Sequence, residues 1–121
     1  MVISFSSEKP RLRLLAGEKV YTARLHRRKQ FTDKNWGKAL KDWACERRCG
    51  PKIADVFIWE IGHVDTYQLE LYRDSSGFDS MEEWLKELNR LIKWKDIRRT
   101  DRFWLYMVQE RGAAFKPSAP S

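Results

Sequence analysis

The sequence predicts an α+β fold in which a small mixed β-barrel of about five strands is flanked by about three helices. Short segments rich in β-branched and aromatic residues indicate strands, and one later segment combines a capping box with apolar residues at helical spacing. Hydrophobic residues make up 42% of the 121 residues, which is enough for one modest core. We find no internal repeat that would indicate a repeat protein instead.

The first quarter of the chain favours a strand, a helix and a second strand. Residues 2–5 suit a short strand, and residues 7–17 begin with a serine that can cap a helix and end at a glycine. The second strand is expected from Lys19 to Arg28. Because side chains alternate along a strand, Thr22 and Arg24 should lie on the same face.

The middle of the chain is predicted to form one helix and one hairpin. A helix is expected from Thr32 or Asp33 to Gly50, because apolar residues recur there at helical spacing until a Gly-Pro pair stops it. Residues 54–61 and 64–72 favour two strands joined by the intervening Gly-His pair.

The last third contains the strongest helix signal in the chain. Ser80 and Glu83 form a capping box, and the apolar residues that follow make one continuous helical stripe: Met81, Trp84, Leu85, Leu88, Leu91 and Ile92. A final strand is expected over Phe103–Gln109. Residues 1–111 are therefore predicted to form a single domain, and residues 112–121 a flexible tail.

Bulky and sulfur-containing side chains are given structural roles. Four tryptophans lie on apolar stripes and are expected in the core rather than as platforms for stacked bases: Trp36, Trp43, Trp84 and Trp104. Cys45 and Cys49 fall inside the predicted middle helix and are interpreted as idle thiols, since no second Cys or His pair completes a zinc site. We therefore expect no metal and no cofactor.

The net charge of the chain is concentrated near its start. Residues 9–29 contain eight basic residues and one acidic residue, so this segment alone accounts for the formal net charge of +7. Clustered Lys and Arg residues favour a polyanionic partner such as RNA or another nucleic acid. No apolar run is long enough to cross a bilayer and the first residues do not look like a secretory signal, so we expect a cytoplasmic protein without a membrane partner.

One motif lies within this basic segment. The pattern Gly-x-Lys-x-x-Thr-x-Arg occurs at the predicted helix-to-strand junction and consists of Gly17, Lys19, Thr22 and Arg24. Here the chain resembles the ASCH family of the PUA-like superfamily, whose signature is GxKxxExR. Residues 77–84 are similar to the start of that family's long helix, and residues 103–106 to its closing strand, so the resemblance covers most of residues 1–111.

The resemblance implies a PUA-like pseudo-barrel with the motif lining a cleft for RNA or a modified nucleoside. The main hypothesis is then an RNA-binding module without catalytic activity, in which Lys19 and Arg24 contact phosphate or a base edge and Thr22 lines the cleft. The remaining basic residues of the segment would hold the RNA backbone. These are Arg11, Arg13, Arg27, Arg28 and Lys29.

Two alternatives follow from the same residues. Thr22 stands where many family members carry Glu, and this is similar to small acetylcytidine amidohydrolases in which Lys and Thr of the motif and a later Glu are catalytic. The resemblance thus also allows a hydrolase acting on nucleic acid or a modified nucleoside, a ribonuclease or an acetylcytidine amidohydrolase, with Lys19, Thr22 and Asp74, the acid nearest to the expected Glu. A module that binds an acidic protein is the third possibility.

Overall fold

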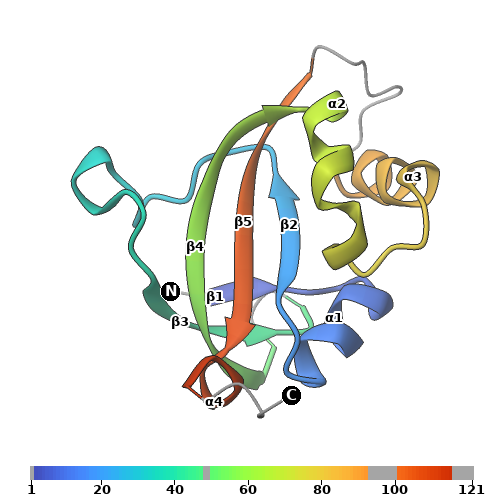
Figure 1. The fold of residues 1–121 in the computed structure, drawn as a ribbon. Helices are drawn as coiled ribbons and strands as arrows, with labels where there is room; N and C mark the ends of the chain where they lie inside the picture. The colour runs from blue at the N-terminus through green and yellow to red at the C-terminus, as the bar shows by residue number, and fades with distance from the viewer. Residues whose placement is uncertain (1, 48–49, 93–100, 116–121) are drawn as a thin grey trace, which may run out of the picture.

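The chain folds around one five-stranded sheet that curls into a half-barrel with helices packed beside it, so the predicted mixed α+β fold is confirmed (Figure 1). The computed structural model describes residues 2–47, 50–92 and 101–115. The strands are β1 (Val2–Ser4), β2 (Val20–Arg24), β3 (Leu40–Cys45), β4 (Lys52–Asp65) and β5 (Arg102–Glu110). The helices are α1 (Glu8–Leu15), α2 (Thr66–Leu69), α3 (Met81–Ile92) and α4 (Arg111–Phe115), with 3₁₀ turns η1 (Asp33–Asn35) and η2 (Glu70–Ser75).

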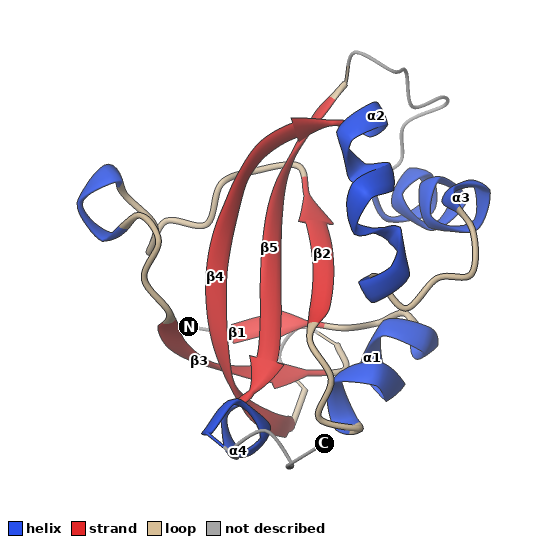
Figure 2. Cartoon of the chain, in the orientation of Figure 1, coloured by secondary structure: helices blue, strands red, loops and turns tan. Residues whose placement is uncertain are grey.

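The strand order β1-β3-β4-β5-β2 makes the first two strands of the chain the two edges of the sheet. The pair β1 and β3 is parallel, whereas the other three neighbouring pairs are antiparallel. On the sheet, α1 and α3 lie beside β2, and η1 stands away from them beyond β4 (Figure 2). This order leaves β1 and β2 without a strand on their outer sides, and the candidate site lies there.

Side chains of the half-barrel form two core clusters. The first lies inside the curl and includes Ile3, Val20, Ile58, Tyr106 and Val108. The second joins the outer side of the sheet to the helices and includes Ala23, Leu69, Trp84, Leu88, Phe103 and Leu105. Strand β5 supplies both clusters because its successive side chains point to opposite faces.

Several predicted elements are confirmed at nearly their predicted bounds. These are β1, α1, α3 and β5, and the motif strand is confirmed in a shorter form that ends at Arg24. The Oγ of Ser80 accepts a hydrogen bond from the Glu83 backbone N–H at 3.1 Å, as the predicted capping box requires. Ser7 occupies the N-cap position of α1, but its hydroxyl donates to Glu87 of α3 instead of capping its own helix.

The predicted helix from Thr32 or Asp33 to Gly50 is wrong. Only the short η1 is helical there, and Leu40–Cys45 is strand β3 between β1 and β4. The alternating pattern of this strand is hidden because the polar Asp42 is buried, at 3% exposure, where an apolar residue would be expected. Cys45 is therefore on a buried strand and not in a helix, while Cys49 lies outside the described residues.

The predicted hairpin at Gly62 and His63 is also wrong. β4 continues from Lys52 to Asp65, and the register shift between Glu60 and Gly62 marks a bulge within the strand. The residues expected as the second strand form α2 and η2 instead, because Asp65 and Gln68 make a capping box with a 2.8 Å bond from the Gln68 N–H to the Asp65 carboxylate.

Two smaller expectations concern the tail and the tryptophans. The predicted tail begins with a helix, α4, whose Arg111 donates to the carbonyls of Val56 and Asp42, whereas residues 116–121 lie outside the described residues. Among the predicted core tryptophans, Trp84 is buried and Trp43 and Trp104 are half-buried, but Trp36 is 69% exposed.

Candidate functional site

The two edge strands β1 and β2 face each other across an open seam of the half-barrel. Side chains rather than backbone ladders join β1 to β2 and to the loop after it. Nη2 of Arg24 on β2 donates to the Ser4 carbonyl at 2.7 Å, and Nη2 of Arg28 in the loop donates to the Val2 carbonyl at 3.0 Å. Edge strands carry unpaired carbonyl groups, which need hydrogen-bond donors from elsewhere in the fold. The guanidinium groups supply those donors, and they place two positive charges at the seam.

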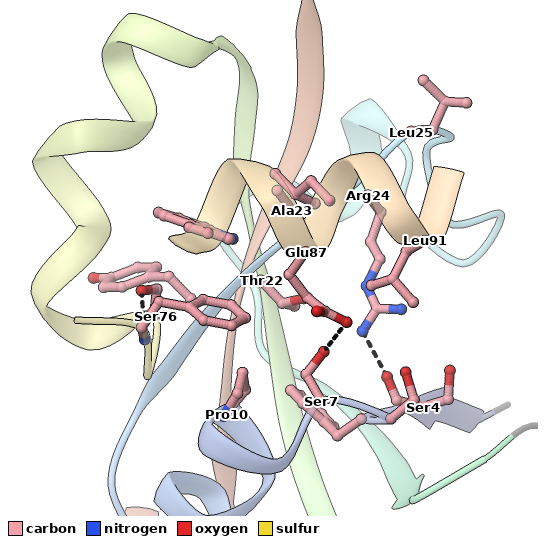
Figure 3. Close-up of a pocket in the computed structure, with 16 residues that line it drawn as sticks. Ser4, Ser7, Pro10, Thr22, Ala23, Arg24, Leu25, Ser76, Glu87 and Leu91 are labelled. Carbon is pink, nitrogen blue, oxygen red and sulfur yellow. Dashed lines mark hydrogen bonds between the residues drawn. The ribbon is translucent and has the colours of Figure 1, made fainter. Parts of the chain in front are cut away.

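A cavity of about 260 Å³ opens at this seam between α1, β2 and α3 (Figure 3). Four aromatic side chains line it, namely Phe5, Tyr21, Phe78 and Trp84. The polar side chains that line it belong to Ser4, Ser6, Ser7, Thr22, Arg24, Ser76 and Glu87. It is thus a mostly apolar space with a few polar groups, as small-molecule sites usually are.

Arg24 is the charged group of the cavity wall on the β2 side. Its guanidinium lies 5.8 Å from the centre of the Phe5 ring, and its Nε is buried without a hydrogen-bond partner. Burial lowers the pKa of Arg24 to about 10, and the nearby charge of Arg28 acts in the same direction. A buried N–H without an acceptor costs about 1–3 kcal/mol, so the Nε of Arg24 is a donor that a bound acceptor would satisfy.

Glu87 supplies a carboxylate from α3, opposite Arg24 (Figure 3). Its Oε1 accepts a 2.9 Å bond from the Ser7 hydroxyl and is also bonded by the guanidinium of Arg90. The hydrogen bond from Arg90 is the main reason that the pKa of Glu87 is below its ordinary value; the Ser7 bond adds to it and burial opposes it. The group is therefore an ionised acceptor at neutral pH.

Of the three motif side chains that were expected at the cleft, the structure brings two together at the cavity and leaves Lys19 outside. Thr22 and Arg24 both line it, on the same face of β2 as expected. Lys19 is exposed, does not line the cavity, and has its ammonium 5.9 Å from the Tyr21 ring. Lys29 is exposed in the loop after β2.

The other arginines of the basic segment have partners within the protein. Arg27 makes two bonds, of 2.9 and 2.7 Å, to the buried carboxylate of Glu60, and Arg28 bonds Asp42 at 2.8 Å. Arg11 donates to two backbone carbonyls, and Arg13 donates to the Lys19 carbonyl at 2.8 Å. These contacts occupy most of the guanidinium groups that were expected to hold an RNA backbone.

The carboxylate of the cavity is not the one that sequence reasoning selected. Asp74 lies on η2 with its side chain 92% exposed and its nearest cation the neighbouring Arg73, and it does not line the cavity. Glu87 was missed, although its position gives a signal: it follows Trp84 by three residues and precedes Leu91 by four, so all three share one face of α3.

Within the described part of the chain, no cluster of three or more His, Cys, Asp or Glu side chains could hold a metal ion. The described helices are likewise too short or too polar to cross a membrane.

Comparison with protein-family models, with curated proteins and with solved structures finds no match to this chain, so the site is interpreted from its own residues.

Proposed function

We propose that this protein is an RNA-binding module that holds one unpaired base in the seam cavity. The observation that carries the proposal is the combination, in one cavity, of aromatic walls, a buried guanidinium from Arg24 and an ionised carboxylate from Glu87. Proteins that recognise RNA in a sequence-dependent way bind splayed-out bases by stacking and by hydrogen bonds to the base edge.

The size of the cavity favours a ligand no larger than a nucleoside. Its volume of about 260 Å³ is slightly below the range of roughly 300–1,000 Å³ found for drug-sized ligands. Phe78 and Trp84 lie nearly parallel, with ring centres 6.4 Å apart and an interplanar angle of 22°. These walls suit a flat heterocycle, which has apolar faces and a polar rim.

The polar groups indicate which rim would fit. Arg24 can only donate, so it would meet carbonyl or ring-nitrogen acceptors, whereas the ionised Glu87 can only accept and would meet an amino or imino N–H. The hydroxyls of Thr22 and Ser7 can do either. A base that carries an acceptor and an N–H donor on one edge therefore satisfies both charged walls.

We also propose that the chain has a PUA-like fold and belongs to the ASCH family. The half-barrel sheet, the position of Thr22 and Arg24 at its open edge, and the long helix beside them all support the resemblance found in the motif. In that reading the cavity is the cleft that the motif was expected to line.

Binding is better supported than hydrolysis. A hydrolase using Thr22 as nucleophile needs a base beside its hydroxyl, but Lys19 and Asp74 both lie outside the cavity. Glu87 lines the cavity, yet its lowered pKa makes it a weak base and a poor proton donor at neutral pH. Incubation with acetylcytidine and with RNA tests this alternative, and turnover that Thr22→Ala abolishes would favour it.

The decisive experiment measures binding of the four common ribonucleosides and of single-stranded RNA to the wild type and to Arg24→Met. We expect Arg24→Met to weaken both by roughly tenfold or more, since a well-placed guanidinium contributes about 1–3 kcal/mol to base discrimination. Arg24→Met also removes the 2.7 Å bond to the Ser4 carbonyl, so some loss of thermal stability is expected, and binding is measured at a temperature at which the variant is folded.

Arg73→Met is the matched control, because Arg73 lies on η2 outside the cavity and is paired with the exposed Asp74. It should bind like the wild type. If no ribonucleoside binds to the wild type, or if Arg24→Met binds as well as the wild type, the proposed function is wrong.

A further inference from the structure

The segment between the end of β2 and the start of β3 forms an ordered loop that stands away from the sheet. We define the Trp36 loop as residues 29–41, which includes the first two residues of β3; its η1 turn lies on the side of the sheet opposite α3 (Figure 2). Phe31 anchors it in the first core cluster at 4% exposure. Asn35 holds its tip, because its side chain accepts from the Thr32 N–H and donates to the Gln30 carbonyl, both at 2.8 Å.

This scaffold presents a tryptophan to solvent. Trp36 follows η1 directly and is 69% exposed, although Phe31 in the same loop is buried in the core. Gly37 comes next with φ at +79°, a conformation that places the following chain back toward β3. A large aromatic side chain is thus held in the open by a hydrogen-bonded turn.

Four lysines flank Trp36 in the sequence, and all four are exposed: Lys29, Lys34, Lys38 and Lys41. Among the described residues, none of their ammonium groups makes an ion pair or a hydrogen bond. Asp33 is the single acid of the loop, and it lies 3.7 Å from Arg27. The loop therefore combines one free aromatic face with a strong local excess of free positive charge.

We propose that the Trp36 loop is a second contact surface for single-stranded RNA, with Trp36 stacking on an unpaired base and the four lysines contacting phosphates. Proteins that bind single strands combine aromatic platforms with cationic grooves in this way, and every base offers a face for stacking. The inference rests on the proposed function and extends it, because the loop lies away from the seam cavity and would engage a neighbouring part of the same strand.

Charge and composition favour a nucleic acid over a membrane surface. Helices and loops that bind membranes insert an apolar face of several large residues. Within the Trp36 loop, Trp36 is the single large apolar side chain that is strongly exposed, since Phe31 is buried and Leu40 is half-buried. One ring and four lysines match a base and its phosphates better than an acyl layer.

The test compares two ligands on the same variants. Fluorescence anisotropy measures binding of a labelled oligouridylate about 12 nucleotides long, within the site sizes of single-strand binders. Calorimetry measures binding of a free ribonucleoside, which reaches the seam cavity but cannot span to the loop. Trp36→Ala should weaken oligonucleotide binding by roughly five- to a hundredfold, the range that loss of one stacked base gives, and leave nucleoside binding unchanged.

Conservative and control variants separate stacking from folding. Trp36→Phe should recover most of the affinity, whereas Tyr67→Ala removes another exposed aromatic, on α2, and should have no effect. Lys34→Gln with Lys38→Gln should reduce the slope of log affinity against log salt by about 0.7 per lysine, as for phosphate contacts on single strands. Lys86→Gln, an exposed lysine on α3, is the charge control.

Each outcome has a defined meaning. If nucleoside binding is normal but Trp36→Ala binds the oligonucleotide like the wild type, this inference is wrong while the proposed function stands. If Trp36→Ala instead abolishes binding to vesicles of anionic lipid and not to RNA, the loop is a membrane contact and the inference is also wrong. If no nucleoside binds at all, the proposed function fails independently of the loop.

Discussion

The seam of the half-barrel and the Trp36 loop are both positively charged, but they carry that charge in different side chains and different surroundings. At the seam the charge is on Arg24 and Arg28, whose guanidiniums are largely covered and donate to backbone carbonyls of β1. In the Trp36 loop it is on exposed lysines without partners among the described residues. The seam therefore holds its charges in hydrogen-bonded positions, whereas the Trp36 loop presents its charges to solvent.

This difference follows from the two side chains. A planar guanidinium has five donors and can satisfy a carboxylate and a carbonyl together, so it suits buried junctions between strands. A lysine ammonium is strongly hydrated and loses little when it stays in solvent. The basic segment that appears uniform in the sequence therefore divides into arginines that hold the fold together and lysines that remain available for a polyanion.

The adjacent residues Arg28 and Lys29 allow a direct test of this division. Arg28→Ala removes the guanidinium that bonds the completely buried carboxylate of Asp42 at 2.8 Å. We expect a loss of about 3–5 kcal/mol in the free energy of unfolding, the usual cost of breaking a buried ion pair. Lys29→Ala should change it by no more than about 0.5 kcal/mol, as is usual for exposed positions.

Urea denaturation of the two variants measures both free energies under identical conditions. A cost below about 1 kcal/mol for Arg28→Ala would mean that this arginine is not structural, since exposed pairs contribute no more than that. The comparison between seam and loop would then lose its physical basis. RNA binding should show the reverse pattern, with Lys29→Ala causing the larger change in salt dependence.

Replacing one glycine near the seam cavity and one in the Trp36 loop should change the free energy of unfolding by a smaller amount. Gly77 has φ at +92°, and a Cβ there would lie 2.8 Å from backbone atoms of Pro10, which lines the cavity. Gly37 has a similar φ of +79°, but a Cβ there would meet nothing within 4 Å. Gly77→Ala should cost about 2–4 kcal/mol, from left-handed strain plus overpacking, whereas Gly37→Ala should cost only the strain of about 1–2 kcal/mol.

Thermal and urea unfolding of the two glycine variants measure this difference directly. Equal costs would mean that the contact between residue 77 and α1 can relax freely, and the cavity wall would then be softer than the contact distance indicates. A larger cost for Gly77→Ala would confirm that the cavity is closely packed on its α1 side while the loop remains open.

The elements that were predicted correctly are those whose secondary structure is indicated by residues close together in the sequence. Helix α3 has its capping serine and an unbroken apolar stripe, and β5 is a nearly continuous apolar run. β3 has no such local signal, because the buried acid Asp42 stands where an apolar residue would mark the pattern. The first part of β4 was predicted, over residues 54–61, but its continuation was not, because the buried Glu60 and the bulge after it interrupt the pattern. The cations of these two acids, Arg28 and Arg27, come from a distant part of the chain, so the compensation is invisible in either strand alone.

The candidate site was predictable to a similar degree. Thr22 and Arg24 were found because the motif lies on one strand, where the two-residue period fixes their common face. Glu87 was missed because its meeting with Ser7 joins residues eighty positions apart, and that contact depends on how α3 docks against α1. Proximity in sequence selected Asp74, which the fold places in solvent.

The smallest expected effect is the change with pH in the contribution of Glu87 to the free energy of unfolding. Its pKa is lower in the folded protein than in the unfolded chain, so it contributes stability that is present above about pH 4.3, the ordinary value for Glu, and is lost as pH falls through the lowered value. Because the group is partly exposed, the contribution should be below about 1 kcal/mol. Glu87→Gln should therefore be less stable than the wild type at neutral pH, and the difference should shrink toward pH 3.

The exposed Glu82 on the same helix provides the control, since Glu82→Gln removes a carboxylate without removing a contact to Ser7 or Arg90. Urea unfolding at several pH values between about 3 and 7 gives both curves, over the range in which carboxylates titrate. A Glu87→Gln curve parallel to that of the wild type would contradict the bonding found for Glu87. A convergence at low pH would instead show that the carboxylate opposite Arg24 is ionised and held in place before any ligand enters the cavity.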